Sequence, residues 1–191
     1  MQASLSDFIP KNFEIGEEET EMFQIYFQRE KIKKNEILLH NGEICNKVYA
    51  VSEGLLRTFH TNKNGTEFTR LLVPEGKFCT ILLSFQERIA SPATIQALEE
   101  STVYSITHTD FRKLISESAK AKNLYMHILE AYQNFQLCRL EFLTTLNPQE
   151  KVEQFLAENS VLEKRISSKV IASYLQITPE TYSRCKKKMT S

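Results

Sequence analysis

The sequence predicts an α+β protein, in which a β-rich half comes first and a helical half follows. Three observations predict this. All five glycines lie before residue 77, and the last four recur every 11 or 12 residues. Beyond Pro92 there is no glycine, and only Pro148 and Pro179 follow. Apolar residues recur at helical spacing from residue 121 onward. Regularly spaced turns are typical of antiparallel sandwiches and barrels, whereas the second half is predicted to be helical.

The composition is that of a globular chain able to bury a core. The chain has 191 residues, of which 41% are hydrophobic, and 24 basic side chains balance 24 acidic ones. No apolar run approaches the roughly 20 residues of a membrane-spanning helix, and the N-terminus has no signal-peptide pattern. Cys45, Cys79, Cys138 and Cys185 lie far apart without a C-x-x-C pair. We therefore expect a cytoplasmic protein with free thiols, no metal and no cofactor.

The zero net charge conceals an asymmetry between the two ends. Residues 1–30 carry seven acidic and two basic side chains, whereas residues 164–191 carry seven basic ones and Glu180 alone as an acid. This distribution predicts that the C-terminal end meets a polyanion.

The first half is predicted to contain an acidic helix around 17–29 and then short strands. Lys63-Asn64-Gly65 is predicted to be a hairpin turn, because Asn-Gly tolerates the positive φ of tight turns. The predicted strands cover 36–39, 48–51, 55–59, 68–73, 94–98 and 102–106.

A long helix is predicted next, with a heptad stripe of seven apolar positions. The stripe consists of Ala121, Leu124, Ile128, Ala131, Phe135, Cys138 and Phe142. Steps of three and four over three heptads are typical of a helix packed along a near-parallel partner. A second apolar strip consists of Tyr125, Leu129, Tyr132 and Leu143, so that one strip can cover the β-rich half while the other meets a second subunit. We expect a homodimer with Leu124, Ile128, Ala131, Phe135, Cys138 and Phe142 at the interface; the alternative is a helix lying only on its own β-rich half.

The C-terminal segment has the pattern of a helix-turn-helix. Asn147 and Pro148 begin a new helix as N-cap and first helical residue. Farther on, Ile171 and Leu175 lie one helical turn apart, and small Ala172 permits a close helix crossing. Thr178 and Pro179 then begin the second helix, with Tyr182 and Cys185 on its inner side. The second helix of this motif enters the major groove of DNA, so double-stranded DNA is the predicted partner.

Two groups of side chains are predicted to contact the duplex. Glu180, Thr181 and Arg184 occupy the exposed start of the second helix, where Arg can bond guanine and Glu can accept from cytosine. The side chains suited to phosphate oxygens, which fix position without reading sequence, are Ser168, Lys169, Ser183, Lys186, Lys187 and Lys188.

In these motifs the chain resembles the CRP/FNR family of bacterial transcription regulators. The C-terminal stretch that carries the resemblance is Ile171-Ala172-x-x-Leu175-x-Ile177-Thr178-Pro179-Glu180-Thr181-x-Ser183-Arg184. The N-terminal stretches are Lys34-x-Glu36-x-Leu38-x-x-x-Gly42-Glu43, Val48-Tyr49-x-Val51-x-x-Gly54, Leu71-x-Val73-Pro74-x-Gly76-x-Phe78 and Ala93-Thr94-Ile95-x-Ala97-Leu98. The resemblance implies an antiparallel β-roll (a double-stranded β-helix) as a cyclic-nucleotide-binding-like sensor domain at 1–118. It further implies a dimerisation helix at 119–145 and a helix-turn-helix DNA-binding domain at 146–191.

The sequence departs from the family pattern around the expected ligand pocket. Members that bind cyclic nucleotides carry a Gly-Glu pair and an Arg-Ser or Arg-Thr pair, where this chain has residues 79–82 and Ser91-Pro92. We therefore expect no cyclic-nucleotide binding, since a buried phosphate without charged partners is costly. If an effector exists, it is expected to be a small or apolar molecule contacting Thr80, Ser91 and Tyr125; an empty pocket is the alternative. Gln176 also stands where the family's turn usually has glycine.

Two other classes of function are open to such a sequence. A metal-dependent enzyme on a double-stranded β-helix needs clustered ligands, and His40, His60, His108 and His127 form no His-x-His pair. We therefore do not expect an enzyme and name no catalytic residue. A ligand-binding or scaffold protein, with a degenerate helix-turn-helix that does not read DNA, is the alternative to a sequence-specific transcription regulator.

Overall fold

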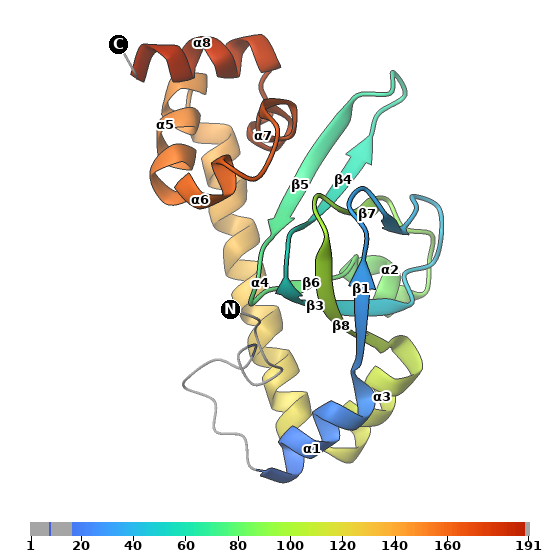
Figure 1. Cartoon of the computed structure of the whole chain (residues 1–191). Coiled ribbons are helices and arrows are strands. Elements are labelled where there is room, and N and C mark those ends of the chain that lie inside the picture. Colours follow the sequence, from blue (N-terminus) through green and yellow to red (C-terminus); the bar gives the residue numbers. More distant parts are fainter. Residues whose placement is uncertain (1–7, 9–16, 190–191) are drawn as a thin grey trace. The chain divides into compact units, whose positions relative to one another are not determined.

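The computed structural model of the chain describes Phe8 and residues 17–189 (Figure 1). The chain divides into two compact units, and helix α4 (Ala119–Thr145) contributes to both. The first unit comprises residues 1–60 and 71–129, and the second comprises residues 61–70 and 130–191. The domain boundaries predicted after residues 118 and 145 stay a prediction.

Two antiparallel four-stranded sheets form the β-rich part, in the orders β1-β8-β3-β6 and β2-β7-β4-β5. The strands are β1 (Gln28–Ile32), β2 (Ile37–Leu39), β3 (Lys47–Glu53), β4 (Leu56–Thr61), β5 (Glu67–Val73), β6 (Phe78–Cys79), β7 (Thr94–Ala97) and β8 (Ser101–Thr107). Apart from the hairpin of β4 and β5, the pairs join strands far apart in the sequence: Gln28 lies opposite Ser105, and Leu56 lies opposite Ala97. This is the antiparallel roll that the sequence predicts, and each predicted strand overlaps an observed one.

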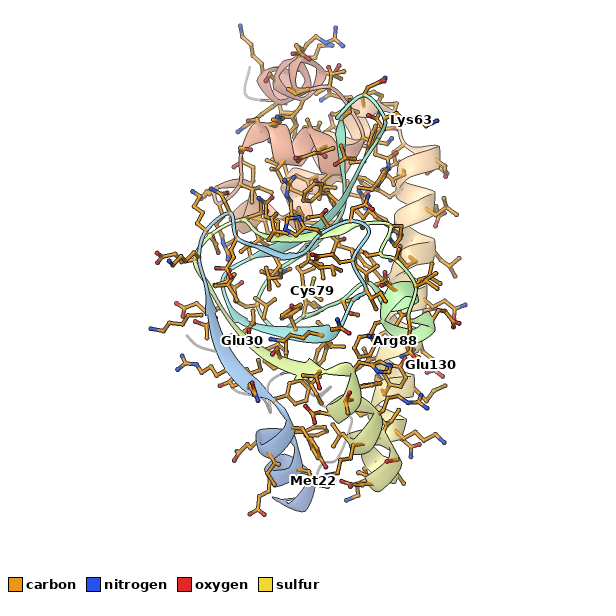
Figure 2. All side chains as sticks on the ribbon, turned by 90° about the vertical axis from the view of Figure 1, so that its right-hand side faces the viewer. Met22, Glu30, Lys63, Cys79, Arg88 and Glu130 are labelled. Carbon is orange, nitrogen blue, oxygen red and sulfur yellow. The ribbon has the colours of Figure 1, made fainter. Side chains whose placement is uncertain are left out.

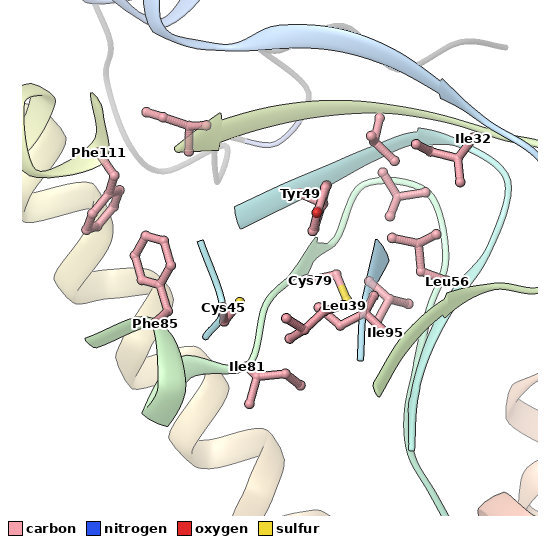
Figure 3. Packing of buried hydrophobic residues seen from close by; sticks show 14 of the residues in the cluster. Ile32, Leu39, Cys45, Tyr49, Leu56, Cys79, Ile81, Phe85, Ile95 and Phe111 are labelled. Carbon is pink, nitrogen blue, oxygen red and sulfur yellow. The ribbon is translucent and has the colours of Figure 1, made fainter. Parts of the chain in front are cut away.

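The core of the first unit lies between the two sheets. Figure 3 shows Leu39, Leu56 and Ile95 facing Cys79 and Tyr49 across it. Val51 of β3, Leu56 of β4 and Val103 of β8 are fully buried. Burial of the Cys79 thiol raises its pKa far above the ordinary value, so the interior favours neutral groups.

Gly54 permits the tight connection between β3 and β4. Its φ is +97°, and a Cβ atom there would lie 2.7 Å from the carbonyl oxygen of Glu100 and 2.3 Å from Oγ of Ser101. Any side chain would therefore clash with the start of β8, which explains one of the regularly spaced glycines.

The predicted acidic helix is shorter than expected at its C-terminal end. Helix α1 spans Glu17–Tyr26, and β1 begins at Gln28. Residues 28–32 pair with residues 101–105 of β8, and this tertiary pairing overrides the local helical tendency.

Two helices of the first unit were not predicted. Helix α2 (Leu82–Glu87) has six residues, too few to produce a periodic pattern. Helix α3 (His108–Glu117) begins where Thr107 accepts a hydrogen bond from the backbone N–H of Asp110. At the C-terminal end of α3, Glu117 accepts a 2.6 Å hydrogen bond from the hydroxyl of Tyr26 in α1.

The predicted long helix is confirmed as α4, and its sides differ in exposure. Ala121 and Leu124 are buried in the core of the first unit, and Ile128 packs against that core. Farther along, Ala131, Phe135 and Cys138 are exposed, and Phe142 is half-buried. Leu137 and Leu140, outside both predicted strips, are 59% and 60% exposed and are the most exposed large apolar side chains of α4 among the described residues.

The second unit contains four helices after α4. They are α5 (Pro148–Glu158), α6 (Ser160–Glu163), α7 (Ser168–Leu175) and α8 (Pro179–Met189). Asn147 and Glu150 form a complete capping box at the predicted start of α5. Val152 and Phe155 of α5 pack in the interior with Ile171 and Leu175 of α7, and Tyr182 of α8 is also fully buried.

Candidate nucleic-acid interface

Helix α7 provides the buried half of the predicted helix-turn-helix. The hydroxyl of Ser167 accepts a 3.3 Å hydrogen bond from the N–H of Val170 and caps the helix. Ile171, Ala172 and Leu175 are completely buried, as their spacing predicts. Because Ala172 has only a methyl side chain, a neighbouring helix can approach closely at this position.

The turn between the two helices closes without a glycine. Gln176 adopts the left-handed conformation with φ of +55°, and its N–H bonds to the carbonyls of Ala172 and Ser173. The N–H of Ile177 bonds to the carbonyl of Ala172 at 3.0 Å. Gln176 therefore takes the conformation that glycine would adopt most easily, at a cost in backbone strain.

Helix α8 begins at a side-chain cap. The Thr178 hydroxyl accepts a 3.2 Å hydrogen bond from the N–H of Thr181, and Pro179 is the first helical residue. The backbone amide of Glu180 and the Thr178 hydroxyl hold the pKa of Glu180 below its ordinary value. A carboxylate is thus stabilised at the positive end of the helix.

The two sides of α8 are clearly different. Tyr182 and Cys185 are buried, whereas Glu180 and Arg184 are exposed and lie four residues apart on one face. Thr181 is half-buried, and its hydroxyl accepts a hydrogen bond from that of Thr178. Of the three predicted base-reading residues, Glu180 and Arg184 therefore have the greater freedom to reach base edges.

The predicted phosphate-contacting residues are exposed with one exception. Ser168 and Lys169 begin α7, and Ser183, Lys187 and Lys188 lie on the outer side of α8; all five are exposed. Lys186 is half-buried and forms a salt bridge with Glu163 of α6, which raises the pKa of Lys186. Lys186 can therefore contact DNA only by leaving Glu163.

Arg139 of α4 was missed by sequence reasoning, although it positions α7. Its guanidinium stacks 3.7 Å from the centre of the Tyr174 ring and donates a hydrogen bond to the Tyr174 carbonyl. This contact places a cation at the negative, C-terminal end of α7. Arg139 is only 8% exposed, and burial lowers its pKa. An arginine in a long charged helix normally indicates a solvated side chain, so the sequence gives no signal for this contact.

The residues of the predicted effector pocket bond to nearby groups of the first unit. The Thr80 hydroxyl donates to the Lys47 carbonyl at 3.1 Å, and the Ser91 hydroxyl donates to the Ala93 carbonyl at 2.6 Å. Tyr125 accepts a hydrogen bond from the side chain of Gln86. Each of the three side chains thus has a hydrogen-bond partner within the chain. An effector site shared by the three stays a prediction.

The absence of cyclic-nucleotide binding stays a prediction, and the side chains around these residues bear on it. Arg88, the basic side chain that follows α2, directs its guanidinium to the carbonyl of Cys45 and the side chain of Asn46. Phe85 and Ile81 fill the adjoining interior (Figure 3). A cyclic phosphate buried there could pair with Arg88 only if the guanidinium left these two partners.

An open cavity of about 560 Å³ lies elsewhere in the first unit, over β1, β2 and the start of β3. Glu30, Glu36 and Glu43 line it together with Lys47 and apolar residues such as Ile44. The cavity has no side chain in common with the predicted effector pocket, and sequence reasoning did not point to it.

Other classes of site are not indicated in the part of the chain that the structure describes. Residues 8 and 17–189 contain no group of three metal-binding side chains. None of the helices in these residues has the length and apolar character needed to cross a bilayer. All four cysteines are free thiols.

A roll of antiparallel strands followed by a long helix and a capped helix-turn-helix defines a class of DNA-binding regulators. Comparison with known proteins agrees with this class. Residues 29–118 match the cyclic nucleotide-binding domain family. Over 190 residues the chain is 23% identical to the anaerobic regulatory protein of Haemophilus influenzae, covering 90% of this chain and 71% of that protein. It is 25% identical to the transcriptional activator protein Anr of Pseudomonas protegens over 165 residues, covering 80% and 66%.

Solved structures show the same fold at low identity. FixK2 from Bradyrhizobium japonicum superposes with a TM-score of 0.76 and 16% identity, covering 86% of this chain and 84% of that one. The resemblance seen in the sequence is thereby confirmed: residues 29–118 belong to the cyclic nucleotide-binding domain family, and the chain as a whole is similar to anaerobic and CRP/FNR regulators.

Proposed function

We propose that the protein is a homodimeric, sequence-specific DNA-binding regulator that acts in the cytoplasm and whose β-roll does not recognise cyclic phosphates. The observation that carries the proposal is the structure of α8. Its start is capped by Thr178, its inner side is buried through Tyr182 and Cys185, and its exposed side presents Glu180 and Arg184. A helix built in this way can enter the major groove.

Arg184 and Glu180 are the proposed base-reading residues. Arg184 can donate two hydrogen bonds to O6 and N7 of guanine, and Glu180 can accept from the amino group of cytosine. Lys187 and Lys188, together with Lys169 at the start of α7, would contact phosphates on either side.

The proposed dimer uses the exposed side of α4. Leu124 lies in the core of its own chain, so the interface begins beyond it. Phe135 and Cys138 of the predicted stripe are exposed, but Leu137 and Leu140 are more exposed and lie on the opposite side of the helix, so the proposed interface is centred on Leu137 and Leu140. Two copies related by a two-fold axis would read half-sites about one helical turn apart on a near-palindromic duplex.

The experiment that tests the proposal is selection of binding sites from random duplex, followed by salt-titrated binding of two variants. Arg184→Ala is expected to lose roughly 1–3 kcal/mol on the selected site and to relax discrimination at one base pair, because it removes a base contact. Lys187→Ala is expected to weaken all duplexes alike and to lower the salt slope by about one for each protomer of the dimer.

Two results would contradict this function. If no sequence is enriched, the helix-turn-helix does not read DNA, and a scaffold role is favoured. If Arg184→Ala weakens all duplexes in the same way as Lys187→Ala, Arg184 contacts the backbone and the assignment of base readout is wrong.

A further inference from the structure

The hairpin between β4 and β5 belongs to the same compact unit as the helix-turn-helix. Residues 61–70 group with residues 130–191. Within this unit the hairpin extends beside α7 toward the level of α8 (Figure 1). Lys63 lies at its tip, as Figure 2 shows. No role in DNA binding was assigned to this hairpin from the sequence.

The hairpin is attached to α7 through one hydroxyl group. Oγ of Ser173 accepts a 2.8 Å hydrogen bond from the N–H of Thr69 and donates one of 2.8 Å to the carbonyl of Glu67. It also lies 3.1 Å from Oγ1 of Thr69. A hydroxyl has one donor and two acceptor sites, so all three are used here. Ser173 therefore fixes the hairpin on the first helix of the motif.

The geometry of the attachment is that of a strand pair. β5 is the outer strand of its sheet, and residues two apart on such a strand direct their backbone groups to the same side. The Ser173 hydroxyl bonds the carbonyl of Glu67 and the N–H of Thr69 in the way that a neighbouring strand would.

The tip of the hairpin is held in shape by its own hydrogen bonds. Oδ1 of Asn62 accepts from the N–H groups of Asn64 and Thr66 at 2.9 and 3.0 Å, and Gly65 has φ of +79°. Residues 61–66 are all exposed, and Lys63 is their only charged side chain. The structure shows no ion pair for Lys63 within residues 17–189. The unit thus presents an ammonium group on a loop whose backbone is preorganised, so that little backbone entropy remains to be lost on binding.

We propose that the hairpin tip is a second DNA-backbone contact, in which Lys63 binds a phosphate flanking the segment that α8 reads. This inference rests on the proposed function. Ser173 is the positioning residue, because it fixes the hairpin to α7 while α8 enters the groove. The first helix of the motif crosses the DNA backbone, so an element attached to its side meets the same strand outside the reading segment.

The test uses the full-length dimer, the selected duplex and three lysine variants measured between 50 and 200 mM salt. Lys63→Ala removes one phosphate contact from each protomer, so it is expected to lower the salt slope of the dimer by about two and to weaken binding roughly thirtyfold to a hundredfold near 0.1 M salt. The effect should be equal on specific and random duplex, since a phosphate contact carries no sequence information. Lys187→Ala provides the reference for a backbone contact. Lys34→Ala removes an exposed lysine of the first unit and serves as the matched control, with no change expected.

The role of Ser173 is tested by a double-mutant cycle. Without the hydroxyl the hairpin is no longer fixed, so in the Ser173→Ala background Lys63→Ala is expected to change binding by less than about twofold. Circular dichroism of Ser173→Ala checks that α7 and α8 remain folded.

The outcomes separate this inference from the proposed function. If the unaltered protein binds no duplex, the proposed function itself fails. If it binds and Lys63→Ala matches Lys34→Ala, or weakens binding with an unchanged salt slope, the hairpin contact is overturned. If Lys63→Ala has its full effect in the Ser173→Ala background, Ser173 does not position the hairpin.

Discussion

Gln176 shows how a single backbone angle sets the geometry of a functional turn. Its left-handed conformation allows the N–H groups of residues 176 and 177 to bond the last carbonyls of α7. A residue with a Cβ atom adopts this conformation at a cost of about 1 kcal/mol, which glycine avoids. In the family that the sequence resembles, this turn usually has glycine, and the departure at Gln176 therefore marks a strained residue. The strain is confined to the turn.

Replacing Gln176 by glycine should stabilise the protein. We expect the free energy of unfolding to rise by about 0.5–1 kcal/mol, because the relief of strain exceeds the extra entropy that glycine has in the unfolded chain. Urea denaturation measures the change. Gln154→Gly, on the exposed side of α5, is the matched control and should cost about 1 kcal/mol. Equal destabilisation by both substitutions would show that the turn is not strained.

The ion pair between Glu30 and Lys47 makes part of the stability depend on pH. Lys47 Nζ lies 2.7 Å from Glu30 Oε1, and Ser105 also donates to this carboxylate. Burial alone would raise the pKa of Glu30, but the hydrogen bonds and the charge of Lys47 outweigh it and lower the pKa. A lowered pKa means that the stabilisation is present above the unfolded-state value of about 4.3 and is lost as the pH falls through the folded-state value.

Glu30→Gln should therefore be less stable than the unaltered protein at pH 6, and the difference should decrease as the pH falls below about 4.3. The difference at pH 6 is expected to be less than about 1 kcal/mol, because both side chains are partly exposed. Thermal unfolding at several pH values measures it, and Lys47→Gln should lose the same pH dependence. A difference that stays constant between pH 6 and pH 3 would exclude the ion pair as its cause.

At the scale of elements, α4 shows that the spacing of apolar residues predicts a buried helix face but does not identify what packs against it. The heptad stripe begins with Ala121 and Leu124, which are buried in the first unit of the same chain. Farther along, Leu137 and Leu140 are more exposed than Phe135, although Phe135 belongs to the stripe. Both a helix on a sheet and a coiled coil select apolar residues at steps of three and four, so spacing alone does not distinguish the two.

The dimer interface is expected to include Leu137 and Leu140. The double variant Leu137→Glu with Leu140→Glu should place like charges in the interface and convert the dimer to monomers, because buried unpaired carboxylates are costly. Light scattering measures the mass. Val161→Glu introduces the same charge at an exposed apolar residue of α6 and should leave the dimer intact. A double variant that remains dimeric would place the interface elsewhere.

The helices that begin at clear capping residues were predicted well, and those without such residues were not. Asn147-Pro148 and Thr178-Pro179 specify helix starts by capping chemistry, and the structure places both starts there. Helix α2 has no capping side chain at Ile81, and Arg88 ends it in a left-handed conformation that the sequence does not announce. Arg139 and Ser173 were missed for a different reason. Their roles depend on contacts with residues far away in the chain, which local patterns do not contain.

At the scale of the whole molecule, the roll interior decides which ligands the protein can accept. Cys79, Ile81 and Phe85 are buried in this interior. The hydroxyls of Thr80 and Ser91 bond to backbone carbonyls of the same unit. An entering cyclic phosphate would have to replace these bonds, and Arg88 could pair with it only by leaving Cys45 and Asn46.

Cyclic AMP and cyclic GMP are therefore expected not to bind at micromolar concentration. Loss of the two charge-assisted contacts should weaken binding about a thousandfold or more relative to a site that has both. Isothermal calorimetry with each nucleotide measures the affinity. A dissociation constant in the micromolar range would show that the interior rearranges to admit the ligand.

The attachment of the hairpin to α7 also concerns the protein's solubility. An outer strand with open backbone groups is a template on which another chain can add a strand. The Ser173 hydroxyl occupies the carbonyl of Glu67 and the N–H of Thr69 on the outer strand β5. Whenever α7 moves away, those two groups become available to strands of other molecules. A serine of the DNA-reading motif thus also protects the chain against edge-to-edge aggregation.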